Sequence, residues 1–417
     1  MKALRLGFIP LSDCAVLAVA VEKGFFRRHG VDVTLSREVS WANIRDKVAV
    51  GALDGAQMLA GMPLAAAAGI DPVASPLITA FSLDLNGNAI TVSTEVWHRM
   101  RAAEPAAARP GSAALRRVIE EDRRDERPPL RFAMVYPFST HNYELRYWLA
   151  AGGIDPDSDV ELSVVPPPRM VGALERGLID GFCVGEPWGS LAVQRKRGHI
   201  AATKHEIWNN SPEKVLALNR AFAERQPELH QALLRALIEA AVWTEGNRLE
   251  VAGILATPQY LDTSASLLAK SLTGQMTFGP RESVVNAPDF HVFHRYAANY
   301  PWTSHAVWLL TQMMRWGQLV TPTDVLATAA DVYRPDLYRE AALAVGVAAP
   351  EIDLKREGIH AEAWMLPGAG GAIAMGSDMF CDGRIFDATD VVGYLAGFGI
   401  GAPRMDLDAL AALNTQA

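Results

Sequence analysis

The sequence predicts an α/β protein with two separate strand–helix units and a helix-rich C-terminal region. Short apolar runs of strand length alternate with helical segments, the alternation breaks off and resumes, and helical spacing of apolar residues dominates from about residue 221. Such alternation is typical of a parallel sheet with helices on both faces. The 417 residues, 50% of them hydrophobic, suffice for two or three compact domains.

The first unit is expected over residues 1–87, and it opens directly on an apolar run of strand length. Helix signals follow each strand, and Gly24 supplies the stop signal of the first helix. The expected strands are 4–10, 31–35 and 53–56, and the expected helices are 15–23, 43–50 and 63–68.

The second unit is expected over residues 88–213, entered by a crossing strand at 89–93. Residues 101–130 mix acidic and basic side chains whose charges mostly cancel, which predicts a solvent-exposed helix with flexible flanks. The remaining expected strands are 131–135, 160–165 and 179–184, and the expected helices are 142–151 and 169–176.

Residues 214–417 are expected to return to the first unit and then to form the helical C-terminal region. Residues 366–375 are rich in glycine and alanine and are interpreted as a loop, and the last thirty residues suggest short helices. The expected long helices are 227–247, 251–256, 264–272 and 306–316.

Charge and composition narrow the class of function. The net charge is −8 with no lysine-rich run, which argues against direct nucleic-acid binding. Cys14, Cys183 and Cys381 show neither disulfide nor metal spacing, and His291 and His294 lack a neighbouring carboxylate or thiol at metal spacing, so neither a metal nor a cofactor is expected.

The start of the chain shows no signal-peptide pattern, and no apolar run reaches the roughly 20 residues of a membrane span. We therefore expect a cytoplasmic protein. The alternative is an exported protein whose leader is missing from this sequence.

Hydrogen-bond donors gather at expected strand ends, where open α/β sheets bind ligands. Trp41 follows the second strand, Asn88 lies at the crossing, His141 follows the strand that begins the second unit, and Lys214 lies near the return crossing. Each also has an ordinary explanation, as a core indole, a helix cap or a surface charge. Serine-hydrolase, zinc-protease and phosphate-loop motifs are missing from the sequence, so the donors suggest binding of a small anion.

Long motifs resemble the nitrate- and bicarbonate-binding subfamily of ABC-transporter solute-binding proteins. The likeness covers most of the first 320 residues. The matching segments are 6–13, 22–26, 40–46, 85–88, 140–141, 146–155, 164–168, 184–188 and 212–214.

The resemblance implies a bilobed, periplasmic-binding-protein-like fold of type II, with an anion in the central cleft. It places Trp41, His141 and Lys214 on the anion, and Asn88 stands where the nitrate-binding members have glutamine. We expect Glu186 to orient His141 or Lys214. The residues implied to line the pocket are Pro167, Val184, Gly185 and Glu186.

The absence of a leader makes the chain most similar to cytoplasmic nitrate/nitrite sensors of the NasS type. The resemblance implies a protein partner, an RNA-binding antiterminator of the ANTAR class (NasT-like), released when nitrate or nitrite binds, so that the pair regulates nitrate assimilation. The alternative function is the receptor of a nitrate or bicarbonate ABC transporter. A third, an enzyme using Cys14 or Cys183 as nucleophile, is disfavoured.

Nitrate fits the donor set on chemical grounds. It is planar, singly charged and accepts hydrogen bonds only, so burying it requires several donors and a compensating positive charge. Bicarbonate adds a hydroxyl donor and would need an acceptor, and Glu186 keeps that ligand open. We expect lobe closure on the ligand as the switching motion.

Overall fold

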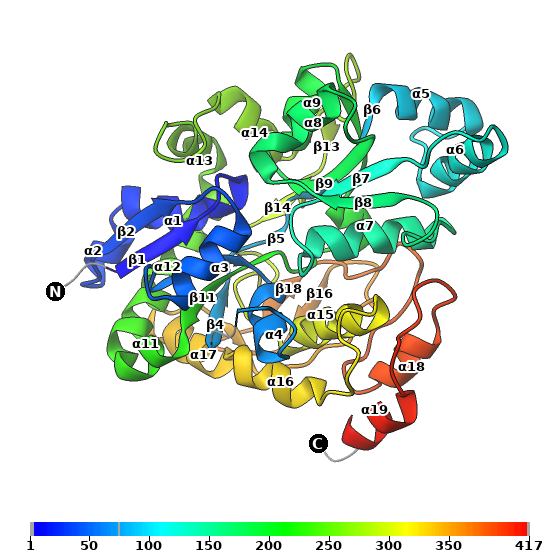
Figure 1. Cartoon of the computed structure of the whole chain (residues 1–417). Coiled ribbons are helices and arrows are strands. Elements are labelled where there is room, and N and C mark those ends of the chain that lie inside the picture. Colours follow the sequence, from blue (N-terminus) through cyan, green and yellow to red (C-terminus); the bar gives the residue numbers. More distant parts are fainter. Residues whose placement is uncertain (1–3, 74–75, 415–417) are drawn as a thin grey trace.

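The computed structural model describes residues 4–73 and 76–414, which form two five-stranded sheets flanked by helices (Figure 1). The first sheet has the strand order β2-β1-β3-β11-β4. Its strands β1 to β3 are parallel, and β11 runs antiparallel between β3 and β4. The strands are β1 (Leu4–Phe8), β2 (Val33–Arg37), β3 (Gly55–Leu59), β4 (Leu77–Ser82) and β11 (Lys214–Asn219).

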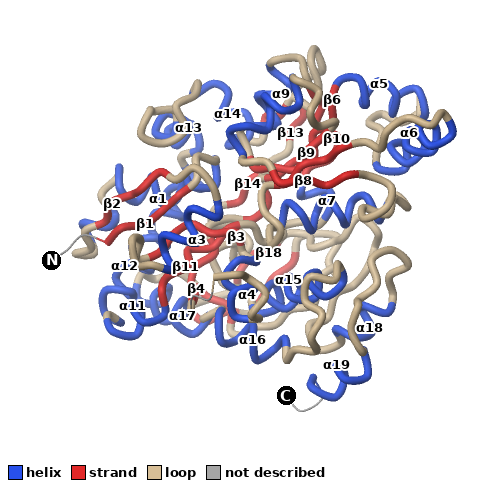
Figure 2. Tube along the Cα trace, viewed as in Figure 1, coloured by secondary structure: helices blue, strands red, loops and turns tan. Residues whose placement is uncertain are grey.

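The second sheet has the order β10-β6-β9-β7-β8. Strand β7 is parallel to β8 and β9, whereas β6 runs antiparallel to β9 and β10. Figure 2 shows the two sheets as separate groups of strands, one above the other. The strands are β6 (Asn88–Ser93), β7 (Arg131–Met134), β8 (Glu161–Val164), β9 (Gly181–Gly185) and β10 (Gly198–Thr203).

Helices that follow these strands pack on the sheets and close the two cores. A short 3-10 helix, η1 (Ser12–Cys14), leads into α1, and a second, η2 (Pro167–Arg169), leads into α8. In the first unit the helices are α1 (Ala15–Glu22), α2 (Phe25–Arg28), α3 (Trp41–Ala49) and α4 (Gly61–Ala67). In the second they are α5 (Thr94–Ala103), α6 (Ser112–Arg124), α7 (Thr140–Ala151), α8 (Met170–Glu175), α9 (Trp188–Gln194) and α10 (Lys204–Ile207).

The C-terminal half wraps around the first sheet. Helix α12 packs against α1 and α2, and α15 and α16 pack against α4. The helices are α11 (Arg220–Arg225), α12 (Pro227–Gly246), α13 (Arg248–Leu255), α14 (Ala265–Thr273), α15 (Thr303–Arg315), α16 (Val325–Val332), α17 (Pro335–Ala344), α18 (Val391–Ala396) and α19 (Leu407–Asn414). No helix among these residues is both long and apolar enough to cross a membrane.

Short two-stranded pairings complete the structure. Their strands are β5 (Leu85–Asn86), β12 (Gln275–Met276), β13 (Val285–Asn286), β14 (His291–Val292), β15 (Ala349–Pro350), β16 (Trp364–Leu366), β17 (Gly368–Ala369) and β18 (Ile373–Met375). Strand β16 pairs antiparallel with β18, so the loop predicted at 366–375 is wrong at both of its ends. Its glycines form the connection between strands, because Gly370 and Gly371 adopt positive φ angles.

The segment 101–130 also differs from the prediction. It contains the end of α5 and all of α6, and the two helices pack against each other. Leu115 and Val118 of α6 are buried, and Asp122, also buried, pairs with Arg99 of α5 and with Arg127. The charged face that suggested a solvated helix is therefore only one side of a packed helix.

The chain crosses between the two sheets at 83–88 and returns at 204–213. Asn86 ties these crossings together, because its side-chain amide donates to Asn210 Oδ1 at 3.1 Å and its Oδ1 accepts from the Ser211 backbone at 3.2 Å. Strand β14 pairs with β5 on the first crossing. The crossings therefore place residues of both sheets, and of the return strand β11, around one point.

Candidate functional site

Trp41, His141 and Lys214 lie together between the two sheets. Trp41 begins α3 after β2, His141 is in the first turn of α7 after β7, and Lys214 begins β11. The Lys214 ammonium is 5.5 Å from the centroid of the Trp41 ring. His141 Nε2 is 3.5 Å from Glu213 Oε1, and the same carboxylate accepts from Lys214.

The ordinary explanations for two of these residues do not hold. Lys214 is fully buried, so it is not a surface charge. The cap of α7 is Ser139, whose hydroxyl oxygen accepts from the Asn142 backbone at 3.0 Å, so His141 does not serve as the cap. Neither ring nitrogen of His141 makes a hydrogen bond within the described part of the chain, although Nε2 lies near Glu213.

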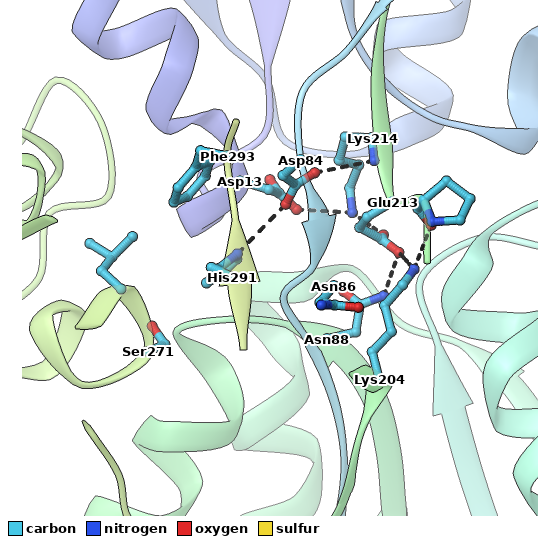
Figure 3. A network of polar contacts seen from close by, with 12 residues as sticks. Asp13, Asp84, Asn86, Asn88, Lys204, Glu213, Lys214, Ser271, His291 and Phe293 are labelled. Carbon is cyan, nitrogen blue, oxygen red and sulfur yellow. Dashed lines mark hydrogen bonds and ion pairs between the residues drawn. The ribbon is translucent and has the colours of Figure 1, made fainter. Parts of the chain in front are cut away.

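Glu213 is the centre of the arrangement, and the sequence analysis missed it. Its fully buried carboxylate accepts from Lys204 Nζ at 2.5 Å and from Asn88 Nδ2 at 2.6 Å (Figure 3). It also accepts from Thr140 and Lys214. These donors come from both sheets and from both crossings. The sequence indicates a role for Glu213 only through its position beside Lys214, in the motif at 212–214.

Lys204 is a second lysine that the sequence analysis missed. It begins the short helix α10 and is buried. Its ammonium pairs with Glu144 and Glu213 and donates to the Pro212 carbonyl at 2.6 Å. A lysine at a helix start ordinarily points to solvent, so only the packing of α10 against α7 reveals its burial.

Three further carboxyl groups surround the lysines. Burial raises the pKa of Asp13 to about 6 although Lys214 lies 2.9 Å away, and burial raises the pKa of Asp84 to about 8 against the opposing Lys214. Burial likewise raises the pKa of Glu144, in spite of Lys204. Near neutral pH these groups therefore favour their protonated forms more than ordinary carboxyls do, which lowers the negative charge around the site.

The other charged groups keep their charge. Burial opposes ionisation of Glu213, but Lys204, Lys214 and then His141 hold its pKa well below the usual range. Burial opposes protonation of the two lysines, but the pKa of Lys214 is raised by Asp13 and Glu213, and that of Lys204 by Glu144 and Glu213. Burial lowers the pKa of His141 far enough to leave its imidazole neutral.

Several buried polar atoms at this place lack a hydrogen-bond partner among the described residues. They include the indole Nε1 of Trp41 and both ring nitrogens of His141. Buried polar groups in folded proteins ordinarily have hydrogen-bond partners, so these atoms are available to a ligand or to water. Two neutral donors beside a buried lysine offer what a small anion requires.

Asn88 lies in the cluster with its amide already engaged. Its Nδ2 donates to Glu144 at 3.1 Å as well as to Glu213, so it positions carboxylates, and only its Oδ1 is unpartnered. Gly185 is opposite Asn88 in the pairing of β6 with β9. A Cβ atom at Gly185 would lie 3.3 Å from Asn88 Oδ1 and 3.4 Å from Asp13 Oδ2, so this glycine faces the cluster.

The other predicted lining residues have the following positions in the fold. Val184 belongs to the hydrophobic core, and Pro167 is buried at the start of η2. The carboxylate of Glu186 accepts from the Ser190 backbone N–H at 3.1 and 3.2 Å, at the start of α9. It therefore does not orient His141 or Lys214 as expected. The sequence alone could not show that the backbone at the start of α9 binds this side chain.

A pocket of about 590 Å³ lies where the ends of β1 and β2 face the segment after β8, and its lining residues are separate from those of the cluster. Ser40, the residue before Trp41, is part of its wall. Arg37 and Arg169 both line the pocket, and their positive charges would favour entry of an anion. The pocket is lined by Pro10, Arg37, Glu38, Val39, Ser40, Pro166, Pro168 and Arg169.

The thiols give no support to an enzyme. Cys14 and Cys183 are fully buried, and burial raises the pKa of each thiol well above its ordinary value. A nucleophilic cysteine needs its thiolate form. No cluster of three or more His, Cys, Asp or Glu side chains suited to a metal ion is present in the described ranges.

This chain is similar to a known protein family and to individual proteins of that kind. Residues 1–256 match the NMT1-like family. The chain belongs to this family. It is 34% identical over 408 residues to the nitrate/nitrite binding protein NrtA of Synechococcus elongatus, covering 95% of this chain and 86% of that protein. It is 39% identical over 401 residues to the nitrate import ATP-binding protein NrtC of Synechocystis sp., covering 95% of this chain.

The chain spans only 55% of the length of NrtC. Among solved structures, the periplasmic nitrate-binding protein NrtA from Synechocystis superposes with a TM-score of 0.84 at 29% identity, over 96% of this chain and 99% of that one. This similarity confirms the predicted bilobed α/β fold of periplasmic binding proteins. Both NrtA proteins are named as binding proteins, which agrees with a function other than catalysis for this chain.

Proposed function

We propose that this protein binds nitrate or nitrite between its two lobes, as the solute-binding part of an anion uptake system. One observation carries the proposal: Trp41 Nε1 and the His141 ring are buried, make no hydrogen bond to the described residues, and lie in the same cluster as the buried cation Lys214. The nitrate/nitrite binding relatives support the choice of anion.

The surrounding carboxyl groups do not oppose this function. Glu213 takes up part of the charge of both lysines and fixes their position. Asp84 and Glu144 have raised pKa values because they are buried, so protons neutralise them more readily than in water. A singly charged anion then meets two ammonium groups together with the carboxylates of Glu213 and Asp13, since a pKa of about 6 leaves Asp13 mostly ionised at neutral pH.

Bicarbonate is the second candidate ligand, for a specific reason. Its hydroxyl needs an acceptor, and Asn88 Oδ1 is a buried acceptor without a hydrogen-bond partner among the described residues. Nitrate offers no proton to this atom. Comparing the two anions on one protein sample therefore tests which set of unpartnered atoms the ligand uses.

The experiment is isothermal titration of nitrate, nitrite and bicarbonate into protein freed of ligand by partial unfolding and refolding. Trp41→Phe keeps an aromatic ring but removes the indole N–H. We expect it to weaken nitrate binding about tenfold or more, the usual effect of losing a hydrogen bond to a charged group.

Trp208→Phe is the matched control. Trp208 is also buried with an unpartnered Nε1, but it packs against Trp308 and Phe380, away from the site. We expect its nitrate affinity to match that of the unaltered protein. Absence of binding by all three anions, or equal effects of both substitutions, would contradict the proposal.

One relative is named as a nitrate import protein and another as a periplasmic nitrate-binding protein, which favours uptake over regulation. Control of an ANTAR-class antiterminator, in the cytoplasm, remains a narrower proposal that rests on the sequence resemblance alone. A nitrate-sensitive complex with such a partner, recovered from the cytoplasmic fraction, would support it. Recovery of the mature protein outside the cytoplasm would exclude it.

A further inference from the structure

A second pocket, of about 320 Å³, lies at the end of α7 that is remote from His141. The last residue of α15 and the segment around residue 398 close it from the other side. The distance along α7 from His141 to Ala151 is about 15 Å at the usual rise per residue. Its wall includes Tyr147, Ala151, Arg315, Asp382, Arg384 and Phe398.

Arg315 is the unusual member of this wall. It is only 3% exposed, and its Nη2 donates to the Ile400 carbonyl at 3.1 Å. Its Nε and Nη1 are buried and have no hydrogen-bond partner, and no carboxylate pairs with it within the described part of the chain. Buried charges are normally paired with an opposite charge, but this guanidinium has no such counter-ion among the described residues.

Aromatic rings stabilise the cation without satisfying its N–H groups. The guanidinium carbon lies 3.5 Å from the centroid of the Phe398 ring, 4.4 Å from that of Trp316 and 5.1 Å from that of Tyr147. Such stacking covers the faces of the planar group. The N–H donors lie in its plane and still require acceptors.

The charges of the pocket add up to one positive charge. Arg384 also borders it and stacks on Phe398 at 4.2 Å, but its Nε pairs with Asp382 at 3.1 Å. Arg315 has no such partner, and burial lowers its pKa only to about 10, so it stays protonated at neutral pH. A single negative charge would complete the balance.

We propose that this pocket binds a small organic monoanion, with a carboxylate on Arg315 and an apolar body against Phe398 and Ala151. The pocket is within the usual range of small-molecule sites, roughly 300–1,000 Å³, and is larger than an inorganic anion needs. The proposal shares no residue with the nitrate site and does not depend on it.

Titration calorimetry with benzoate tests the proposal on the full chain. Benzamide serves as the neutral analogue, because it keeps the ring and the shape but lacks the charge. We expect saturable binding of benzoate and at least about tenfold weaker binding of benzamide. Equal binding of the two, or no saturable benzoate signal at millimolar concentration, would overturn the proposal.

Two substitutions locate the binding. Arg315→Met keeps the length and the apolar stem and removes the charge, and Ala151→Phe fills the pocket from an exposed position that is not needed for folding. Each should weaken benzoate binding about tenfold or more. Arg220→Met removes a partly buried arginine that pairs with Asp331 elsewhere, and its benzoate affinity should be unchanged. Full affinity in folded Ala151→Phe protein would refute the location.

Discussion

Lys204 and Lys214 illustrate at the scale of single residues how the protein keeps charge inside its core. Each ammonium contacts two carboxylates, and Glu213 is common to both. Removing one partner of a buried pair leaves an uncompensated charge, which costs about 3–5 kcal/mol. The cluster must therefore be considered as a unit, and substitution of a lysine would test stability as much as binding.

The pH dependence of stability follows from the buried carboxyl groups. Burial raises the pKa of Asp84 to about 8 and also raises that of Glu144, whereas both ionise near pH 4 in the unfolded chain. The folded state holds protons that the unfolded state has lost, so the stability from these groups falls as pH rises through the folded pKa.

We therefore expect the free energy of unfolding to fall between pH 7 and 8.5, measured by urea denaturation. Asp84→Asn removes the group whose folded pKa, about 8, lies within this range, and should flatten this slope. Asp122→Asn changes a buried carboxylate that pairs with Arg99 and Arg127 outside the cluster, and should leave the slope in place. A free energy that rises over this range would contradict the assignment.

At the scale of elements, α7 links the second sheet to the site. Its first turn carries Thr140, His141 and Glu144, which face the two lysines and Glu213. Ser139 starts the helix by accepting from the Asn142 backbone, and its hydroxyl donates to the Tyr136 carbonyl at 2.6 Å. The position of the imidazole therefore depends on this cap.

Ser139→Ala should lower the free energy of unfolding by about 0.5–2 kcal/mol, the usual effect of losing an N-cap, and should also weaken nitrate binding. Ser264→Ala removes the corresponding cap of α14, whose hydroxyl accepts from Leu267. It should destabilise the protein without changing nitrate affinity. Calorimetric titration and urea denaturation of both variants measure the two effects, and identical nitrate affinities would disprove the role of the Ser139 cap.

At the scale of the whole molecule, the crossings hold the two lobes in register. Gly87 lies on the first crossing with a φ angle of 87°, and a Cβ atom there would be 2.3 Å from the ring of His291. The Gly87 N–H donates to the Phe290 carbonyl at 2.7 Å, so the backbone cannot easily move away. Only glycine fits this close approach.

Gly87→Ala should therefore destabilise the protein more than a positive φ angle alone would. Gly69 has a φ angle of 72° with nothing within 4 Å of its added Cβ, so Gly69→Ala measures the backbone effect, about 1–2 kcal/mol. The difference between the two variants in urea denaturation reports the contact with His291. Equal losses would show that the ring moves aside freely.

The elements with clear periodicity were predictable, whereas some fully buried strands were not. Helices such as α1, α7 and α12 lie within a few residues of the predicted ranges, because their apolar spacing is local. Strands β4, β10 and β11 were missed, since nearly all of their residues are buried and they show no polar alternation. The gathering of Trp41, His141 and Lys214 was expected from strand ends and resemblance.

By itself, the sequence determined the strand–helix alternation, the two α/β units and three donors of the candidate site, because local periodicity and strand ends are written in short windows of residues. Only the tertiary structure decided that Glu213 and Lys204 complete the cluster, that Glu186 belongs to α9, and that Arg315 lacks a counter-ion. Burial and pairing of charges depend on residues that are distant along the chain, and folding alone brings them together.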